Sequence, residues 1–422
     1  MTLHHHFLNS TGISTDTRKI KKDNIFFALK GDNFNGNTYA DLAIDQGASY
    51  VVIDEEQFKK DDRYILVDDV LQTLQELASF HRNYLGIPII SLTGSNGKTT
   101  TKELINAVLT KGYKTVATVG NLNNHIGVPL TLLSMSKDTE LGIVEMGANH
   151  IGEIEMLCNI AQPDYGYITN FGKAHLEGFG SEEGVVIGKS ELYKHLKSHD
   201  KIVFVNSNDA KQVDLTKGMK TFTFGLKQSD VWVSFKNVNP LVEMNLDNLT
   251  IKSNLIGVYN SNNIAAAVAI GRYFNISDKH IVEAIENYVP SNNRSQIIKK
   301  DKLTILLDAY NANPSSMKVA LENLQALNDT PKYAILGDMF ELGASAKKEH
   351  MSIAKLAASI HLDGVLLVGE NFSNLNFDAP GIAYYTSTKE LMENEDFSKY
   401  KTGTLLVKGS RGMALEQILD KL

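Results

Sequence analysis

The residues best suited to chemistry lie at positions 93–100, Thr-Gly-Ser-Asn-Gly-Lys-Thr-Thr, between an apolar run at 87–92 and a helical pattern at 99–109. Glycines allow the backbone to bend until successive N–H groups converge on phosphate oxygens, and the positive end of the following helix adds to the attraction. Lys98 is predicted to reach the β- and γ-phosphates of a nucleotide, and the Thr99 hydroxyl is predicted to bind the Mg²⁺ that bridges them.

This loop is a shortened form of the usual phosphate-binding pattern, because Leu92 stands where a glycine is expected five residues before Gly97. The alternative is an ordinary strand-to-helix turn rich in glycine and asparagine. Gly-Lys-Thr in this setting favours nucleotide binding. The residues predicted to surround the phosphates are Gly94, Ser95, Asn96, Gly97, Lys98, Thr99 and Thr100.

Candidate metal ligands follow two further strands. Phosphoryl transfer needs positive counter-charge, which a bound metal ion can supply. The ligands of that metal ion are expected at the carboxyl ends of neighbouring parallel strands. Glu145 ends the apolar run at 141–146, where an acid is costly unless it binds something, so a metal ligand is favoured over a buried ion pair. His175 follows the run at 165–169 and is, by itself, equally well a loop histidine. Lys189 lies in the helical stretch 182–197, whose pattern alone predicts a solvent-exposed lysine.

The elements that must position these residues alternate between apolar runs and helices. Runs at 87–92, 141–146 and 165–169 are each followed by a helical stretch, at 99–109, 151–161 and 182–197. Strands joined by crossover helices predict a mostly parallel sheet that is covered on both faces. Residues 221–251 are predicted to form antiparallel strands, and residues 259–273 a buried, alanine-rich helix.

Smaller α/β patterns flank this central part. Strands are predicted at 25–29, 50–53 and 64–67 with a helix at 39–46, and later at 303–307, 333–336, 365–368 and 404–407, before a last helix. Asn313 is predicted to cap a helix that Pro314 opens. We therefore predict an α/β protein of three domains: a small N-terminal α/β domain (1–82), a central P-loop-type domain with a mostly parallel sheet (83–298) and a C-terminal Rossmann-like α/β domain (299–422).

Composition narrows the class of protein. The 422 residues are 43% hydrophobic and 22% charged, as in water-soluble globular proteins. The net charge of −7 is spread without a basic run, which argues against nucleic acid and against anionic lipid and favours a small-molecule substrate. With one cysteine, Cys158, and no long apolar run, we expect a cytoplasmic protein without membrane insertion. We also expect a monomer. His4, His5 and His6 cannot all face one site, so we predict a mobile start there.

Together these segments resemble the bacterial muramyl ligase family, which builds the peptide stem of peptidoglycan. The resemblance rests on the loop at 93–100, on Glu-Met-Gly-Ala-Asn at 145–149 and on Ala-His-Leu-Glu-Gly-Phe-Gly-Ser at 174–181, and it covers nearly the whole chain. It implies an ATP-dependent carboxylate–amine ligase that forms ADP and uses Mg²⁺. It makes Lys98, His175 and Lys189 catalytic and Thr99, Glu145, His175 and Lys189 the metal set, with Lys189 carbamylated.

The resemblance also assigns nucleotide contacts. Asn260 and Asn263 match the asparagines of the adenine-side motif, in which Tyr259 replaces the usual histidine. Arg294 matches the ribose-side arginine, although Asn293 precedes it where the family has glycine. Asp308, at a predicted strand end, is expected to reach the nucleotide across the domain cleft.

The outer domains carry the substrate motifs of the resemblance. Blocks at 307–317 and 336–343 are typical of the members that add D-alanyl-D-alanine, and Thr15, Asp16, Thr17, Arg18, Asn35 and Gly36 resemble the segments that hold the UDP end of the substrate. The implied substrates are UDP-N-acetylmuramoyl-tripeptide and D-alanyl-D-alanine. The residues expected on the dipeptide side are Tyr310, Asn311, Asn313 and Arg411, of which Arg411 is equally well part of a basic C-terminal loop.

Two alternatives remain. A related ligase of the folylpolyglutamate or cyanophycin type would use another amine, but the UDP-like motif and Asn-Ala-Asn-Pro at 311–314 count against it. A non-catalytic nucleotide-binding switch would need no amine acceptor, so ADP formation that is independent of D-alanyl-D-alanine would favour it.

Overall fold

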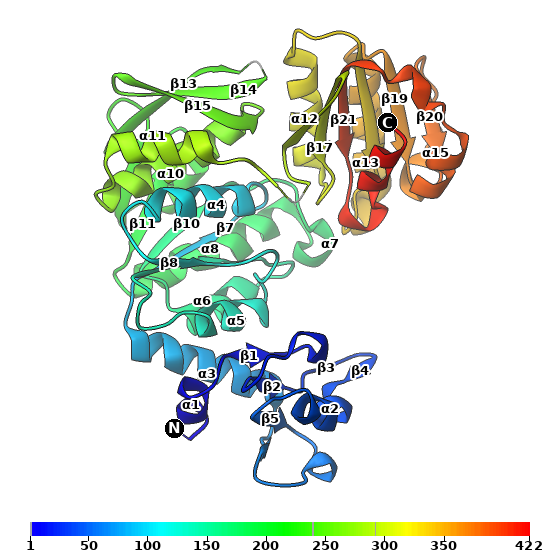
Figure 1. Cartoon of the computed structure of the whole chain (residues 1–422). Coiled ribbons are helices and arrows are strands. Elements are labelled where there is room, and N and C mark those ends of the chain that lie inside the picture. Colours follow the sequence, from blue (N-terminus) through cyan, green and yellow to red (C-terminus); the bar gives the residue numbers. More distant parts are fainter. Residues whose placement is uncertain (1, 239, 292) are drawn as a thin grey trace.

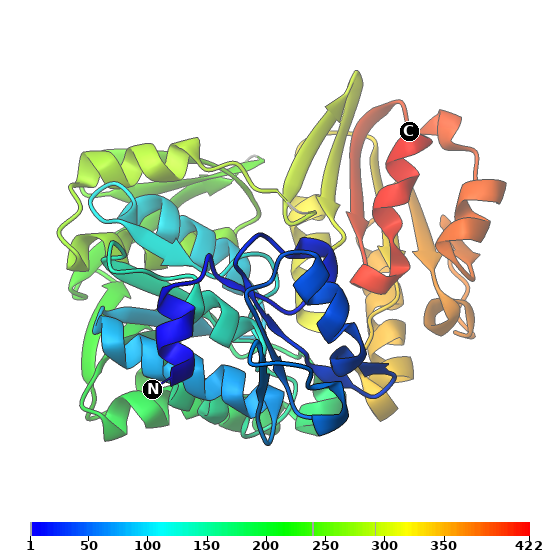
Figure 2. The same ribbon diagram turned by 60° about the horizontal axis from the view of Figure 1, so that its bottom comes forward.

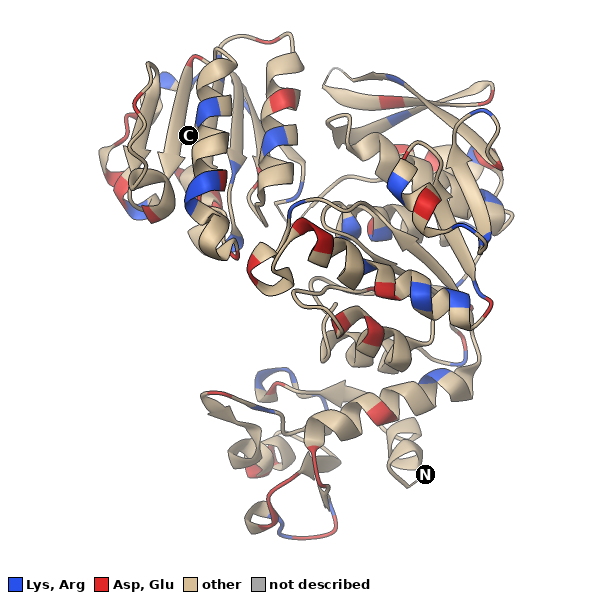
Figure 3. Cartoon of the chain, turned by 180° about the vertical axis from the view of Figure 1, so that it is seen from behind, with Lys and Arg blue, Asp and Glu red and all other residues tan. Residues whose placement is uncertain are grey.

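The computed structural model describes residues 2–238, 240–291 and 293–422, which form three α/β units in chain order (Figure 1). Turned as in Figure 2, the first unit lies in front of the central one and the third unit stands beside them. Lys and Arg positions are interspersed with Asp and Glu positions in all three units (Figure 3). In these described ranges, no helix is long and apolar enough to cross a membrane.

The first unit is built on a parallel sheet in the order β1-β2-β5-β6. Its three predicted strands are confirmed: β2 is fully buried and β5 mostly buried, whereas only Tyr64 of β6 is buried. Its elements are β1 (Ile13–Ser14), β2 (Ile25–Phe27), the hairpin of β3 (Lys30–Gly31) and β4 (Phe34–Asn35), α2 (Ala40–Asp45), β5 (Tyr50–Ile53) and β6 (Tyr64–Leu66).

The histidine-rich start is helical, so the prediction of a mobile start is wrong. In α1 (Thr2–Leu8), helical spacing places His4 and Phe7 on one face, which packs against α3 (Val70–Leu85). His4 Nε2 lies 3.1 Å from His81 Nδ1, and His81 Nε2 lies 2.9 Å from the carbonyl of Met135. Burial of the two imidazoles against α3 therefore fixes the chain start.

Helix α3 joins the first two units. Asp69 caps its N-terminus, and Gly86 ends it in the left-handed conformation. Helix α3 packs against α5 (Gly127–Leu133) and α6 (Glu153–Ala161) of the central unit, so the predicted boundary between residues 82 and 83 falls inside a shared helix. The predicted boundary between 298 and 299 likewise falls inside a strand, β16 (Gln296–Lys300).

The central unit contains a nine-stranded sheet in the order β15-β14-β13-β12-β11-β10-β7-β9-β8. The predicted parallel strands and crossover helices are confirmed. The strands are β7 (Ile89–Thr93), β8 (Thr115–Ala117), β9 (Leu141–Glu145), β10 (Tyr165–Ile168), β11 (Ile202–Asn206), β12 (Lys220–Gly225), β13 (Val231–Val238), β14 (Leu241–Leu246) and β15 (Leu249–Ile256).

Only part of the 221–251 region is antiparallel. β12 pairs in parallel with β11 because the short helix α9 (Ala210–Leu215) forms a crossover between them, and β13 pairs in parallel with β12. The antiparallel ladder is confined to β13, β14 and β15. An alternating run shows that a strand exists, but its direction is set by the connection.

Helices cover both faces of the central sheet. Leu104 and Val108 of α4 pack with Ile264 and Val268 of α10 in one core, and the opposite core contains Leu157 of α6. The remaining helices are α4 (Lys98–Leu109), α5 (Gly127–Leu133), α6 (Glu153–Ala161), α7 (Leu176–Phe179), α8 (Glu182–Ser198), α10 (Asn260–Tyr273) and α11 (Asp278–Asn287).

The third unit is a six-stranded sheet in the order β16-β17-β21-β18-β19-β20, parallel except for β16. The predicted last helix is a 3-10 helix, Leu415–Asp420. The other elements are β17 (Lys302–Asp308), α12 (Pro314–Ala326), β18 (Lys332–Gly337), α13 (Ala346–Ser359), β19 (Gly364–Val368), α14 (Glu370–Ser373), β20 (Ile382–Tyr385), α15 (Thr388–Asn394) and β21 (Thr402–Lys408).

Buried histidines predict how stability depends on pH. Burial lowers the pKa of His81, and burial together with the charges of His199 and Lys201 lowers the pKa of His195 from 6.5 to about 4. Below pH 6.5 the folded protein therefore binds fewer protons than the unfolded chain. The contribution of these neutral histidines to the free energy of unfolding is present above that pH and is lost as the pH falls. We expect the temperature at the midpoint of thermal unfolding to be lower at about pH 5 than at about pH 7.

Calorimetry of His81→Gln checks this expectation, and its pH dependence should be shallower than that of the wild type. The exposed His280→Gln is the matched control and should retain the full dependence. If the pH dependence of His81→Gln equals that of the wild type, His81 does not contribute to the loss of stability at low pH.

Candidate active site

The predicted phosphate loop lies between β7 and α4 and approaches β10 closely. Gly94 and Gly97 have φ angles of 141° and 79°, which favour glycine. A Cβ atom on Gly94 would lie 2.0 Å from the Thr169 side-chain oxygen, and one on Gly97 would lie 2.8 Å from Asn263 Oδ1. Both glycines are therefore required by conformation and by space.

Hydrogen bonds from the end of β10 hold the loop in place. The Asn96 N–H donates to Asn170 Oδ1 at 3.2 Å, and Asn170 Nδ2 and Thr169 Oγ1 both donate to the Asn96 carbonyl, at 2.9 and 2.6 Å. Asn170 was not among the predicted site residues. Its contacts require β10 to lie beside β7, which is a property of the sheet order.

The two asparagines predicted on the adenine side brace the loop from α10. Asn263 Nδ2 donates to Asn260 Oδ1 at 2.7 Å, and Thr101 Oγ1 of α4 donates to Asn263 Oδ1 at 3.0 Å. Both asparagines also line the cavity described below. They therefore link α10 to the helix that begins at the phosphate loop.

Lys98 folds back onto its own loop. Its Nζ donates to the carbonyls of Gly94, at 2.7 Å, and Ser95, at 3.4 Å. Burial lowers the pKa of Lys98, with Glu145 opposing this shift and Arg294 adding to it. A phosphate that exchanges for these carbonyls would supply the negative partner that the ammonium group lacks in the loop.

Glu145 ends β9 with one carboxylate oxygen unpartnered. Only 1% of the residue is exposed; Oε1 accepts from Asn123 Nδ2 at 2.8 Å and from Thr99 Oγ1 at 3.3 Å. Within the described part of the chain, Oε2 is buried without a hydrogen-bond partner. Such an oxygen is costly unless a cation binds it, and carboxylate and hydroxyl oxygens suit Mg²⁺. Thr99 and Glu145 therefore fit the predicted metal.

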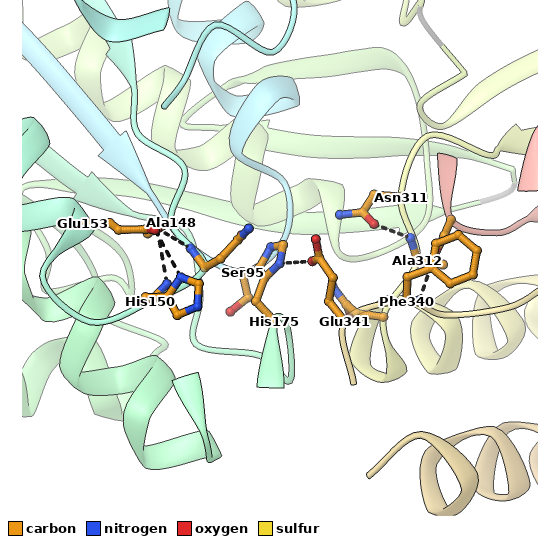
Figure 4. Close-up of polar contacts among 12 residues, drawn as sticks. Ser95, Ala148, His150, Glu153, His175, Asn311, Ala312, Phe340 and Glu341 are labelled. Atoms are coloured by element: carbon orange, nitrogen blue, oxygen red, sulfur yellow. Dashed lines mark hydrogen bonds and ion pairs between the residues drawn. The ribbon is translucent and has the colours of Figure 1, made fainter. Parts of the chain in front are cut away.

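The other two predicted metal ligands make contacts elsewhere. His175 Nδ1 contacts the carboxylate of Glu341 in the third unit (Figure 4). Lys189 Nζ donates to the Ala148 carbonyl at 2.9 Å. Among the residues that the structure describes, no three His, Cys, Asp or Glu side chains gather into a metal-binding group. A cation at Glu145 would therefore need oxygens from phosphate or water as well.

Lys189 is fully buried, so the pattern-based prediction of a solvent-exposed lysine is wrong. Gly188 leaves room for the Phe179 ring against α8, and the Lys189 Nζ lies 4.9 Å from the centroid of that ring. Burial holds the pKa of Lys189 well below its ordinary value; the Lys98 charge adds to the shift, and Glu153 and Glu191 oppose it. The side chain that covers this lysine comes from a neighbouring helix, which a helical pattern cannot reveal.

The third unit meets the phosphate loop through α12. Asn313 caps α12, as predicted, and the structure adds a capping box with Ser316; the Asn313 Nδ2 donates to Asn96 Oδ1 at 2.7 Å. Nearby, the Arg294 guanidinium lies 3.6 Å from the centroid of the Tyr310 ring. Helix α12 therefore presents its capped N-terminus to the loop of the central unit.

Asp308 is held at the end of β17. Its Oδ1 accepts from the Ser295 N–H at 3.2 Å, and its Oδ2 accepts from Lys408 Nζ. Lys408 is 2% exposed and also donates to the Asn311 carbonyl at 3.3 Å. Lys408 is thus a buried partner of Asp308 and lines the cavity described below. Arg411, by contrast, is exposed and pairs with Glu416 at 2.8 Å.

A cavity of about 740 Å³ brings most of the predicted residues together between the central and third units. Its volume falls in the usual range for small-ligand sites. The predicted residues that line it are Ser95, Asn96, Gly97, Lys98, Thr99, Thr100, Glu145, His175, Asn260, Asn263, Arg294, Asp308, Tyr310 and Asn311. Those outside its lining are Gly94, Lys189, Asn313, Arg411 and the six residues of the first unit.

The two predicted segments of the first unit follow neighbouring strands. Asp16 caps a 3-10 helix after β1 and accepts from the Arg18 N–H and Nε, at 3.0 and 2.9 Å. Asn35 accepts from the Asn37 N–H at 3.0 Å, and Gly36 donates to the Leu29 carbonyl at 2.9 Å. β1 and β2 are parallel, so the first segment begins at the carboxyl edge of this sheet, and the Gly36 bond to Leu29 holds the second segment, at the end of the β3–β4 hairpin, near the same edge. Their substrate role stays a prediction.

Sequence reasoning also missed Asn123, which positions Glu145. Asn123 lies after β8, an edge strand of only three residues whose apolar signal is too short to detect. The run of asparagines at 121, 123 and 124 was the available signal, because polar residues after a strand of a parallel sheet gather at its carboxyl edge.

Three family models match the chain: "Mur ligase family, catalytic domain" over residues 9–82, "Mur ligase middle domain" over 92–271 and "Mur ligase, glutamate ligase domain" over 293–411. The UDP-N-acetylmuramoyl-tripeptide--D-alanyl-D-alanine ligase of Bacillus subtilis is 34% identical over 97% of this chain and 93% of its own length. MurF from Acinetobacter baumannii superimposes with a TM-score of 0.87 at 29% identity, covering 97% of this chain and 92% of that one.

A further solved structure carries a nucleotide. MurF ligase from Thermotoga maritima in complex with ADP superimposes with a TM-score of 0.84 at 26% identity, covering 98% of this chain and 97% of that one. The three-unit α/β fold predicted from the sequence is confirmed by these likenesses.

The close approach of Gly94 to β10 gives a testable prediction. Gly94→Ala would press a methyl group onto Thr169 and displace the loop, so we expect nucleotide affinity, measured by calorimetry, to fall at least about tenfold, or 1.4 kcal/mol.

Gly86→Ala is the matched control, since Gly86 is also left-handed but a Cβ there meets nothing within 4 Å. It should destabilise the end of α3 while leaving nucleotide affinity unchanged. Normal affinity in Gly94→Ala would show that this close approach does not shape the binding loop.

Proposed function

Because this chain belongs to the Mur ligase family, we propose that it joins D-alanyl-D-alanine to the terminal carboxylate of UDP-N-acetylmuramoyl-tripeptide in peptidoglycan precursor synthesis. The observation that carries the proposal is the Glu145 oxygen that has no hydrogen-bond partner among the described residues, beside Thr99 and the phosphate loop, in a cavity lined by the central and third units. An ATP-dependent ligase needs a cation and phosphate site of this kind next to the site of its amine substrate.

The phosphate loop would activate the carboxylate. Backbone N–H groups of the loop and the Lys98 ammonium stabilise charge on the γ-phosphate while the tripeptide carboxylate attacks it in line, which forms an acyl phosphate and releases ADP. The dipeptide amine then attacks the acyl carbon, loses a proton, and the tetrahedral intermediate collapses with loss of phosphate. The third unit excludes water, which would otherwise hydrolyse the acyl phosphate.

Mg²⁺ would be held by Thr99, Glu145 and His175, and when bound it neutralises charge on the phosphate oxygens. Lys189 would extend this set as a carbamate, formed when its neutral amine attacks CO₂ and releases one proton. Two observations support this step: the side chain is fully buried, and its lowered pKa favours the neutral amine. The bond to the Ala148 carbonyl places its Nζ beside a residue of the cavity lining.

The three units would divide substrate binding between them. Asn260, Asn263, Arg294 and Asp308 would hold ATP, and the segments around Asp16 and Asn35 would hold the UDP end. Tyr310, Asn311, Asn313 and Arg411 would lie on the dipeptide side. Since the cavity is assembled from one chain, we propose that a monomer suffices, and the use of ATP supports a cytoplasmic location.

The discriminating experiment is phosphate release with each substrate omitted in turn. We expect release only when ATP, UDP-N-acetylmuramoyl-tripeptide and D-alanyl-D-alanine are all present, because the third unit must place the amine near the acyl phosphate.

Lys98→Ala should lower kcat by about two to three orders of magnitude, since it removes charge stabilisation at the transferred phosphate.

Two outcomes would redirect the assignment. Equal turnover with glutamate as the acceptor would favour a ligase of the folylpolyglutamate type. ADP formation that does not depend on the dipeptide would favour a nucleotide-binding switch.

The carbamate at Lys189 is tested separately. Lys189→Ala should lose nearly all turnover, because it removes an anion from the metal set, and acetate in the buffer should restore part of it by occupying the vacated space. Lys194→Ala, on the exposed side of the same helix, is the matched control and should keep wild-type turnover. Wild-type turnover in Lys189→Ala would remove the carbamate while leaving the family membership intact.

A further inference from the structure

Two residues in an uncommon backbone conformation face one another across the interface of the central and third units. His175 and Glu341 have φ angles of 53° and 60°, in the left-handed region that non-glycine residues seldom occupy. Asparagine, aspartate and histidine tolerate this region best, so Glu341 is the more unusual of the two residues there. Such strain persists where the surroundings impose it and clusters at functional sites.

The two side chains meet in this geometry. The Glu341 carboxylate contacts Nδ1 of His175, and Figure 4 shows the two pointing toward each other. His175 also lines the cavity that holds Lys98 and Glu145. Because the two ring nitrogens point away from each other, a carboxylate on Nδ1 leaves Nε2 as the ligand atom. A metal-binding histidine commonly donates its other N–H to such a carboxylate, which fixes its tautomer and ring orientation.

The loop that carries Glu341 is held firmly by the third unit. The Met339 N–H donates to Nε2 of the fully buried His350 at 3.0 Å, and the Phe340 N–H donates to Ser410 Oγ at 3.0 Å. Asp338 accepts from the backbone N–H groups of Asn371 and Phe372, at 2.9 and 3.1 Å. The position of the Glu341 carboxylate therefore follows the position of the whole third unit.

Other contacts dock the same two surfaces without touching the imidazole. The Glu177 N–H donates to the Glu341 carbonyl at 3.1 Å, and Lys173 Nζ lies 3.1 Å from Glu349 on α13. The Lys173 N–H donates to Ser315 Oγ at 2.9 Å. Docking is therefore shared among several bonds, whereas contact with the His175 ring comes from Glu341.

We propose that Glu341 is a positioning residue for the metal site: it accepts the Nδ1–H of His175 and fixes the ring so that Nε2 faces the metal. The inference rests on the proposed role of His175 as a metal ligand. It makes the metal site incomplete until the third unit docks, so that docking of the unit that carries the dipeptide side strengthens metal binding in the central unit.

The test measures Mn²⁺ binding to the full-length protein in the presence of a non-hydrolysable ATP analogue. The electron paramagnetic resonance signal of free Mn²⁺ reports how much Mn²⁺ is bound. Glu341→Gln should weaken Mn²⁺ binding about 10- to 100-fold, the usual effect of losing such a partner. Its turnover should recover largely at saturating Mg²⁺, so that the apparent KM for Mg²⁺ rises more than kcat falls. Glu341→Asp should restore part of the affinity.

Glu349→Gln is the matched control, because it removes an ion pair of the same interface without touching His175. It should bind Mn²⁺ almost as tightly as the wild type. Wild-type Mn²⁺ affinity in Glu341→Gln, or an equal loss in both variants, would overturn the inference. His175→Asn separates the two levels: wild-type affinity in that variant would reject His175 as a ligand and the inference with it.

Discussion

The buried carboxylate of Glu145 places the strongest constraint on the active-site edge of the central sheet. One of its oxygens is satisfied by Asn123 and Thr99, and its backbone N–H donates to Thr118 Oγ1 at 3.0 Å, which leaves Oε2 without a partner among the described residues. Folding around such an oxygen costs free energy that a bound cation returns. Residues from the segments that follow β7 and β8 are thus arranged around the carboxylate that ends β9.

The phosphate loop depends on a second constraint, the absence of side chains at Gly94 and Gly97. These glycines let the loop lie against Thr169, after β10, and Asn263 of α10, and the Thr169 hydroxyl donates to the Asn96 carbonyl of the loop. The loop is therefore preorganised before a nucleotide binds, which reduces the ordering that binding requires. Asn313 of the third unit also donates to Asn96 of this loop, so the position of the third unit affects the contacts of the loop.

Much of the fold could be predicted because its signals are local. Apolar runs of strand length, helical periodicity and capping residues placed the parallel core, and Asn313 and Pro314 open α12 as their residue types require. The errors arose where a distant partner decides. The direction of β12 depends on its crossover helix, His4 is ordered by packing on α3, and the buried Lys189 lies beside Phe179 from another helix.

By itself, the sequence determined the three-unit α/β class and the resemblance that family membership bears out, and it predicted the phosphate loop, because residue types at fixed short spacings carry that information. Only the tertiary structure decided which residues share a cavity, that Lys98 bonds its own loop, that one Glu145 oxygen has no partner in the described ranges and that Glu341 meets His175. The last two residues are 166 positions apart in the chain, and their contact exists only because one unit docks on another. Burial and contact are properties of the packed chain, and no local pattern specifies them.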